Sequence, residues 1–279
     1  MNKNTKNQDA LIDESRAPLI THLIELRDRL KWALLFFLIA FCFCYAYSQE
    51  IYSFLVNPLF EIYKEKNIEN PRMIYTALTE AFFTLLKVSF YSALFISFPV
   101  IALQIYKFAA PGLYNNEKKA FLPFLIATPL LFVMGISLVY YFIFPLAWRF
   151  FLSFQTGNID VGMSIELEAK VNEYLSLVLK LMFAFGLAFQ IPVAITLLSR
   201  AGIITSKQLK QRRKYAIVLA FIMAAILTPP DLISQIGLGI PIIILFEISI
   251  FLAVLFENRK KKKHPIKKNK IYGETDFSD

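Results

Sequence analysis

Long apolar segments alternate with short polar connections along most of the chain. Apolar runs such as 121–144 and 232–256 are close to the roughly 20 residues that a helix needs to cross about 30 Å of hydrocarbon. The pattern predicts six membrane-spanning helices, at residues 32–47, 82–108, 121–148, 174–198, 215–227 and 232–256. We therefore expect an all-α integral membrane protein, a bundle of six transmembrane helices.

The amino-acid composition also indicates a membrane protein. Hydrophobic residues make up 57% of the 279 residues and charged residues 18%, whereas soluble domains average about 45–50% and 25%. A single core surrounded by water cannot bury so much apolar surface in a chain of this length. An ordinary soluble domain is therefore excluded.

The charged residues are distributed unevenly between the connections. The leader, two connections and the tail are basic, through Arg27, Arg29, Lys31, Lys118, Lys119, Lys207, Lys210, Arg212, Arg213, Lys214 and residues 260–263. Connections 49–81 and 149–173 balance or outweigh their few basic residues with carboxylates. By the positive-inside rule, the basic segments and both termini are expected on the cytoplasmic side.

The net charge of +9 would fit a nucleic-acid binder if the protein were soluble. Here the basic residues lie between spans and in the tail, so we expect the lipid bilayer, and no nucleic acid, as their partner. The expected location is a bacterial inner membrane, with an organellar membrane as the alternative. Residues 1–256 are expected to form the membrane domain and 257–279 a basic, disordered cytoplasmic tail.

Local patterns predict how the helices begin and bend. Before the first span, leucines recur at helical spacing from Leu19 to Leu30, which predicts an amphipathic helix at the cytoplasmic surface. Glu25 and Arg29 form an i,i+4 pair on another face of this helix. Proline inside a span removes a backbone hydrogen bond, so the prolines within spans predict a kinked and concave bundle. They are Pro99, Pro129 and Pro192.

The fifth predicted span is short. Its roughly 13 residues form only about 20 Å of helix, less than the usual hydrocarbon thickness, which predicts a locally thinned bilayer. The prolines after Thr228 end this helix, and Asp231 is placed to cap the next one.

The sequence contains no recognisable catalytic, cofactor or metal motif. A Gly-rich phosphate loop, a His-Glu-x-x-His pair and a nucleophile elbow are all missing, and His22 and His264 are the only histidines. Cys42 and Cys44 are the only cysteines and lie within an apolar run, so they form neither a disulfide framework nor a metal-ligand set. We expect no cofactor, no metal and no enzymatic activity.

Several polar side chains lie at membrane depth, where they are costly and need an explanation. They are Glu80, Lys87, Gln104, Lys180, Gln190, Asp231, Gln235 and Glu247. Near span ends, as for Glu80, snorkelling or a local pair competes with a functional role. Gln190 lies deeper, where an interhelical hydrogen bond and a functional cavity are equally compatible with the sequence. Taken alone, Glu25 and Glu117 would be ordinary solvated charges.

Four short motifs resemble those of TatC, the large subunit of the twin-arginine protein translocase. They lie in the expected order, each at the expected place in a six-span topology, and they cover nearly the whole chain. They are residues 19–27, residues 111–119, residues 185–192, and residues 227–231 followed by Ser234 and Gln235.

The resemblance implies a receptor that binds the consecutive arginines of a signal peptide and exports folded proteins with the proton gradient. In the family, the signal-binding carboxylates match Glu25 and Glu117, and Arg27 belongs to the same leader motif. Planar carboxylates suit guanidinium groups because they accept paired hydrogen bonds. The implied partners are small single-span subunits of the TatA and TatB type and further copies of the chain. Many relatives carry Glu where this chain has Gln190, and an amide cannot carry a proton.

Two other classes of membrane protein compete with this interpretation. A secondary transporter of a small solute should show repeat symmetry and a charged site at mid-membrane, which the sequence does not display. A membrane-embedded enzyme needs a catalytic constellation that is also missing. The residues predicted to have a functional role are therefore Glu25, Glu117 and Arg27 for the signal peptide, with Gln190, Asp231, Gln235 and Glu80 as further polar candidates.

Overall fold

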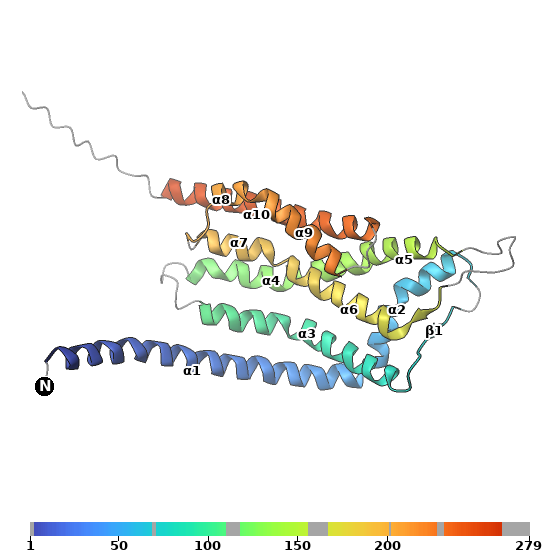
Figure 1. Ribbon diagram of the computed structural model, residues 1–279, viewed down its shortest axis with the longest axis horizontal. Coiled ribbons are helices and arrows are strands. Elements are labelled where there is room, and N and C mark those ends of the chain that lie inside the picture. Colours follow the sequence, from blue (N-terminus) through green and yellow to red (C-terminus); the bar gives the residue numbers. More distant parts are fainter. Residues whose placement is uncertain are drawn as a thin grey trace, which may run out of the picture.

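A computed structural model describes residues 3–68, 71–109, 118–155, 167–200, 202–227 and 232–263, and these residues are almost wholly helical (Figure 1). Most helices run roughly along the long axis of the molecule. Two ends can therefore be named. The α2 end holds α2 and the starts of α3 and α6, and the α8 end holds α8, the end of α3 and the start of α4.

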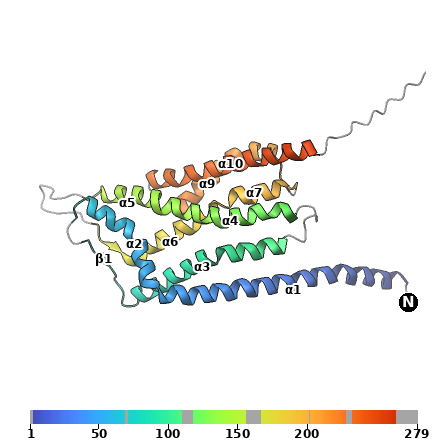
Figure 2. The same cartoon turned by 180° about the vertical axis from the view of Figure 1, so that it is seen from behind.

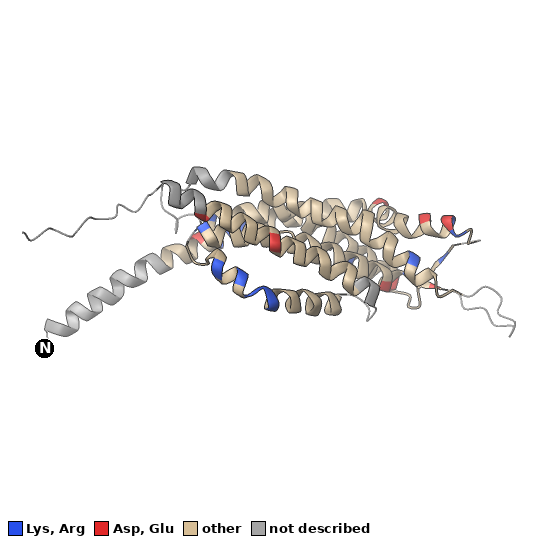
Figure 3. Ribbon diagram, turned by 90° about the horizontal axis from the view of Figure 1, so that it is seen from above, with Lys and Arg blue, Asp and Glu red and all other residues tan. Residues whose placement is uncertain are grey.

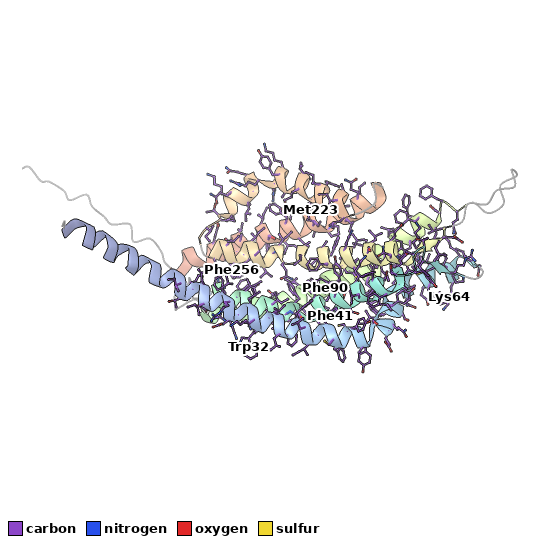
Figure 4. The ribbon with its side chains drawn as sticks, turned by 60° about the horizontal axis from the view of Figure 1, so that its bottom comes forward. Trp32, Phe41, Lys64, Phe90, Met223 and Phe256 are labelled. Carbon is purple, nitrogen blue, oxygen red and sulfur yellow. The ribbon has the colours of Figure 1, made fainter. Side chains whose placement is uncertain are left out.

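The first helix, α1 (Lys3–Ala46), packs against α3 (Glu80–Ala109). Its N-terminal part extends past the end of α3, as Figure 1 and Figure 2 show. The contact is aromatic, with the rings of Phe37 and Phe90 5.3 Å apart, edge to face. Trp32 lies on the side of α1 away from the bundle and is 65% exposed (Figure 4).

The α2 end is closed by α2 (Ser48–Glu65) and a short parallel ladder of β1 (Met73–Ile74) with β2 (Ala169–Lys170). Pro58 lies inside α2 and has no N–H for the carbonyl of Phe54. The hydroxyl of Tyr140 donates to that carbonyl over 2.9 Å. Tyr174 similarly donates to the carbonyl of Leu55 over 3.0 Å. Two tyrosines thus hold α2 against the bundle.

The centre of the bundle consists of α4 (Lys118–Leu138), a π-helical turn η3 (Val139–Ile143), α5 (Phe144–Leu152), α6 (Val171–Ala188) and α7 (Ile191–Arg200). Small residues allow α4 and α6 to approach closely. A Cβ atom on Gly186 would lie 2.5 Å from the ring of Phe132, and one on Gly135 would lie 2.7 Å from the carbonyl oxygen of Phe185. Phe132, Phe144 and Phe185 are fully buried here.

The last three helices are α8 (Ser206–Gln211), α9 (Arg213–Leu227) and α10 (Leu232–Lys263). A capping box between Thr205 and Gln208 starts α8. Leu209 is buried against Ile250 and Ala253 of α10. An apolar cavity of about 630 Å³ lies between α6, α7, α9 and α10, and Met223 of α9 is one of its lining residues (Figure 4).

Five helical segments in the described residues are long and apolar enough to cross a membrane. They are Ile20–Ala46, Glu80–Phe108, Pro123–Leu152, Val171–Arg200 and Gln235–Glu257. They coincide with five of the six predicted spans, and the chain is a multi-pass membrane protein. The remaining predicted span is the 15-residue helix α9, so the total of six stays a prediction.

The leader is helical and joins the first span directly, because α1 continues without interruption from Lys3 to Ala46. Its position at the cytoplasmic surface stays a prediction. Residues 19–46 contain neither glycine nor proline, so nothing stops the helix once it has formed. The prolines also act differently from one another. Pro192 follows a break between α6 and α7, whereas α3 and α4 continue past Pro99 and Pro129.

Candidate functional site

Glu25 lies on α1 at the α8 end and is partly buried. Arg29, one helical turn further on, donates to Glu25 Oε1 through Nε over 3.0 Å and also through Nη2. The sequence-predicted i,i+4 pair is therefore confirmed. The other oxygen, Oε2, lies 3.9 Å from His22 Nδ1 and accepts no hydrogen bond within the described part of the chain. Glu25 thus keeps one carboxylate oxygen available for a further donor.

His22 places this carboxylate beside the end of α3. Its ring stacks on Phe108 with centroids 4.1 Å apart and planes 14° from parallel. Phe108 is the penultimate residue of α3, and residues 110–117 connect α3 to α4. Glu117 falls in this connection, outside the described residues and directly before Lys118, the first residue of α4. Glu25 therefore lies at the end of the bundle from which the connection containing Glu117 starts.

Arg27 is close to Glu25 in sequence but has a different partner. Its Nε donates to Asp28 Oδ1 over 3.1 Å, and its side chain is 61% exposed. Lys31 lies 3.5 Å from the same carboxylate oxygen. Arg27 and Asp28 thus form a solvated pair, and the structure does not bring Arg27 into contact with Glu25.

Basic side chains gather at the same end, on α8 and the start of α9 (Figure 3). They are Lys207, Lys210, Arg212, Arg213 and Lys214, all exposed. Arg213 forms a 2.7 Å ion pair with Glu247 of α10. The carboxylate of Glu257 accepts hydrogen bonds of 2.6 Å from the backbone N–H and the hydroxyl of Ser206. Contacts with α10 therefore hold the basic segment in place at both of its ends.

The sequence allowed two roles for Gln190, an interhelical hydrogen bond or a functional cavity. The structure shows the hydrogen bond. It lies in the break between α6 and α7, and its Nε2 donates to the carbonyls of Thr128 on α4 and Gly186 on α6 over 3.1 and 3.4 Å. Its Oε1 is buried and has no partner in the described part of the chain. Because its amide nitrogen faces two carbonyl oxygens, a hydrogen-bond donor suits this position.

The other polar candidates are dispersed. Gln235 on α10 donates to the carbonyl of Phe221 on α9 over 3.4 Å, which ties these helices together. Asp231 lies outside the described residues. Glu80 lies at the α2 end, where its Oε2 accepts from the backbone N–H groups of Thr76 and Ala77 over 2.8 and 3.3 Å. The structure does not bring Glu80 together with Glu25.

Sequence reasoning did not identify the partners of two charged residues, of which Lys87 was among its polar candidates and Arg200 was not. The guanidinium of Arg200 lies over the neighbouring rings of Phe124 and Phe256, 5.5 and 5.3 Å from their centroids. Lys87 of α3 binds two side chains of α6, which are Asn172 and Ser176. The only sequence signal was a charged residue inside or beside an apolar run, and that signal does not identify the partner.

A family model described as Sec-independent protein translocase protein (TatC) matches residues 21–241. The chain belongs to the TatC family. The matched range includes Glu25, the connection with Glu117, and Gln190.

Individual relatives agree with this assignment. The Sec-independent protein translocase protein TatC of Magnetococcus marinus is 48% identical over 250 residues, covering 90% of this chain and 89% of the relative. The protein of the same name from Escherichia coli strain K12 is 36% identical over 250 residues, covering 90% and 93%. The crystal structure of the twin-arginine translocase receptor TatC has a TM-score of 0.71 and 38% sequence identity, covering 84% of this chain and 98% of that chain.

Proposed function

We propose that this TatC-family chain is the subunit of a Sec-independent protein translocase that receives twin-arginine signal peptides. Relatives are named as translocase proteins, and the similar crystal structures are of the twin-arginine translocase receptor. The observation that supports a site in this chain is the half-satisfied carboxylate of Glu25 at the α8 end. Its role is recognition of a peptide, and we assign it no catalytic step.

In the proposed site, Glu25 and Glu117 each bind one guanidinium group of the signal. Glu25 Oε2 accepts the new hydrogen bond, while Arg29 keeps the carboxylate oriented through Oε1. Arginine suits this task better than lysine, because its planar fork donates several hydrogen bonds in fixed directions. Arg27, with Asp28 beside it, is a further proposed member of the site at its solvated edge.

The proposed orientation of the protein in the membrane follows from the position of the site and of the basic segment, both at the α8 end. The α8 end, with its basic segment, faces the cytoplasm of a bacterial inner membrane, and both termini lie on that side. Six spans, including the short α9, produce this arrangement. The proposed partners are single-span subunits of the TatA and TatB type and other copies of this chain. Gln190, Asp231 and Gln235 are proposed polar contacts on the membrane-embedded part of the receptor.

Binding of an Arg-Arg signal peptide tests the site directly. Glu25→Ala should weaken binding by about tenfold to a hundredfold, because a hydrogen-bonded ion pair is worth about 1.5–3 kcal/mol. Glu25→Gln should do nearly as much harm, because the amide carries no charge. Binding to the purified full chain is measured, with the amount of membrane-inserted protein monitored.

Two controls make the result specific. A Lys-Lys peptide should bind weakly to the parent and to every variant. Glu61→Gln removes an exposed carboxylate of α2, at the opposite end of the bundle from the proposed site, and should leave peptide binding nearly unchanged. If Glu25→Ala and Glu117→Ala both bind the Arg-Arg peptide as the parent does, these carboxylates are ordinary surface charges and the proposed site is wrong.

A further inference from the structure

Two lysines, Lys87 and Lys180, form a cationic cluster that is separate from the proposed signal-peptide site. Lys87 of α3 donates from Nζ to Asn172 Oδ1 over 2.7 Å and to Ser176 Oγ over 2.8 Å. Both acceptors are neutral. Within the described residues, Lys87 forms no salt bridge with any carboxylate. The side chain is partly buried, so its positive charge is only partly compensated by water.

A second lysine adds to this charge. Lys180 lies on α6 one helical turn beyond Ser176, and its ammonium group repels that of Lys87. Lys180 is exposed and also forms no salt bridge in the described part of the chain. Two interacting cations within candidate spans favour an anion, which none of the described carboxylates supplies to them.

Lys87 lines a cavity of about 370 Å³, within the range of about 300–1,000 Å³ typical of small-molecule sites, while Lys180 lies outside the lining. The cavity is lined by Thr76, Ala77, Glu80, Phe83, Lys87, Lys170, Asn172 and Glu173. Its wall therefore carries charges of both signs. Glu173 is 73% exposed and only loosely paired with Lys170, at 3.6 Å. Glu80 Oε1 has a single long contact, 3.4 Å from the N–H of Asn172.

The cavity lies where two candidate membrane spans begin. Glu80 and Val171 are the first residues of two candidate spans, so the cavity is located where the apolar part of the bundle begins. Phe83 at its wall is 57% exposed, and the adjacent Phe82 is 53% exposed. These rings offer an apolar surface for acyl chains next to the charged cavity.

We propose that this cavity binds the headgroup of a phospholipid that carries both a phosphate and a primary ammonium group, which is the chemistry of phosphatidylethanolamine. The phosphate bonds Lys87, with Lys180 and Lys170 nearby, and the ammonium group donates to Glu173 and Glu80. Phosphatidylcholine fits less well because its quaternary ammonium has no N–H. Phosphatidylglycerol fits less well because it has no cation for the carboxylates.

Lipid titration of the purified full chain tests the proposal. Short-chain dihexanoyl forms of the three lipids are added to the protein in detergent, and apparent affinity is taken from the rise of the thermal unfolding midpoint. The ethanolamine lipid should bind about tenfold more tightly than the other two. Soluble O-phosphoethanolamine should bind more weakly than the lipid, because it lacks acyl chains. If it binds as tightly, the assignment to a lipid is wrong.

Variants then connect the preference to the cavity. Lys87→Gln keeps an amide donor for Asn172 and Ser176 and should weaken ethanolamine-lipid binding about tenfold or more. Glu173→Gln should reduce the preference for the ethanolamine lipid over the choline lipid. The matched control is Lys64→Gln, an exposed lysine of α2 at the same end (Figure 4), which should change neither.

The proposal is overturned if the three lipids bind equally to the parent, or if Lys87→Gln and Glu173→Gln keep the parent's preference. Equal loss in Lys64→Gln would also overturn it, because any surface lysine would then suffice. Should Lys87→Gln fail to accumulate, Lys180→Gln and Glu173→Gln decide the outcome, since both replace exposed side chains. Unchanged binding in both would contradict the assignment.

Discussion

At the scale of single residues, glycine determines how closely α4 and α6 pack. Gly186 faces the ring of Phe132, and Phe132 itself stacks on Phe98 with centroids 3.8 Å apart. Because Phe132 is only 1% exposed and held on both sides, it cannot move away from a larger neighbour. Gln190, in the break after α6, bridges the same two helices by donating to the carbonyls of Thr128 on α4 and Gly186 on α6.

Gly186→Ala should therefore destabilise the bundle by about 1–3 kcal/mol, the usual cost of overpacking a close contact. The thermal unfolding midpoint of the purified protein in detergent measures this effect. Gly237→Ala is the matched control, because a Cβ atom there has no neighbour closer than 3.8 Å. Equal midpoints for the two variants would show that α4 and α6 adjust without cost.

At the scale of elements, α8 is a short helix whose position depends on its contacts with α10. Its capping box is internal, through Thr205 and Gln208. Glu257 supplies the connection to α10 by accepting two hydrogen bonds of 2.6 Å from Ser206. Leu209 adds a buried apolar contact. These contacts place the basic segment of the α8 end, which the proposed topology assigns to the cytoplasm.

Glu257→Ala should release the first turn of α8 from α10 while leaving the capping box intact. We expect faster hydrogen exchange of the backbone amides in residues 206–211, because the N–H of Ser206 loses its acceptor. Exchange in α6 should not change, and Glu173→Ala, which removes an exposed carboxylate at the other end, should not affect α8. Unchanged exchange in α8 would mean that Leu209 alone holds it.

At the scale of the whole molecule, the described charged residues lie mainly near the two ends of an apolar bundle (Figure 3). Large apolar side chains along the bundle face outward, as in Leu130, Phe142 and Ile226, which are 68%, 73% and 73% exposed. In water this surface would drive aggregation, whereas in a bilayer it contacts acyl chains. The ends of the bundle are then the surfaces on which water-soluble ligands meet the protein.

Reporter fusions check the proposed orientation. A reporter fused after Leu113 or after Phe256 should remain cytoplasmic, and one inserted near Asn67, in the turn after α2, should be exported. The physical reason is the excess of Lys and Arg around the first two positions. An exported reporter after Phe256 would contradict the even number of spans.

Local patterns in the sequence were sufficient for features that depend on neighbouring residues. Five spans followed from the length and hydropathy of single segments, and the pairing of Glu25 with Arg29 followed from helical spacing. The family motifs placed Glu25 in a candidate site for the same reason, since each motif is a short continuous stretch. Periodicity also predicted a helical leader, but it cannot show whether two helical segments join, and only the structure shows that α1 is continuous.

Only the tertiary structure decided which distant residues meet. Lys87 binds side chains 85 and 89 positions away, and Tyr140 bonds a carbonyl freed by a proline 82 positions earlier, at Pro58. The helices of this bundle are apolar around much of their circumference, so the sequence pattern does not specify which face turns inward. Small residues such as Gly186 and the fit of rings such as Phe132 determine that rotation. The sequence therefore identified the class of protein and its family, and packing determined the cavity at the α2 end.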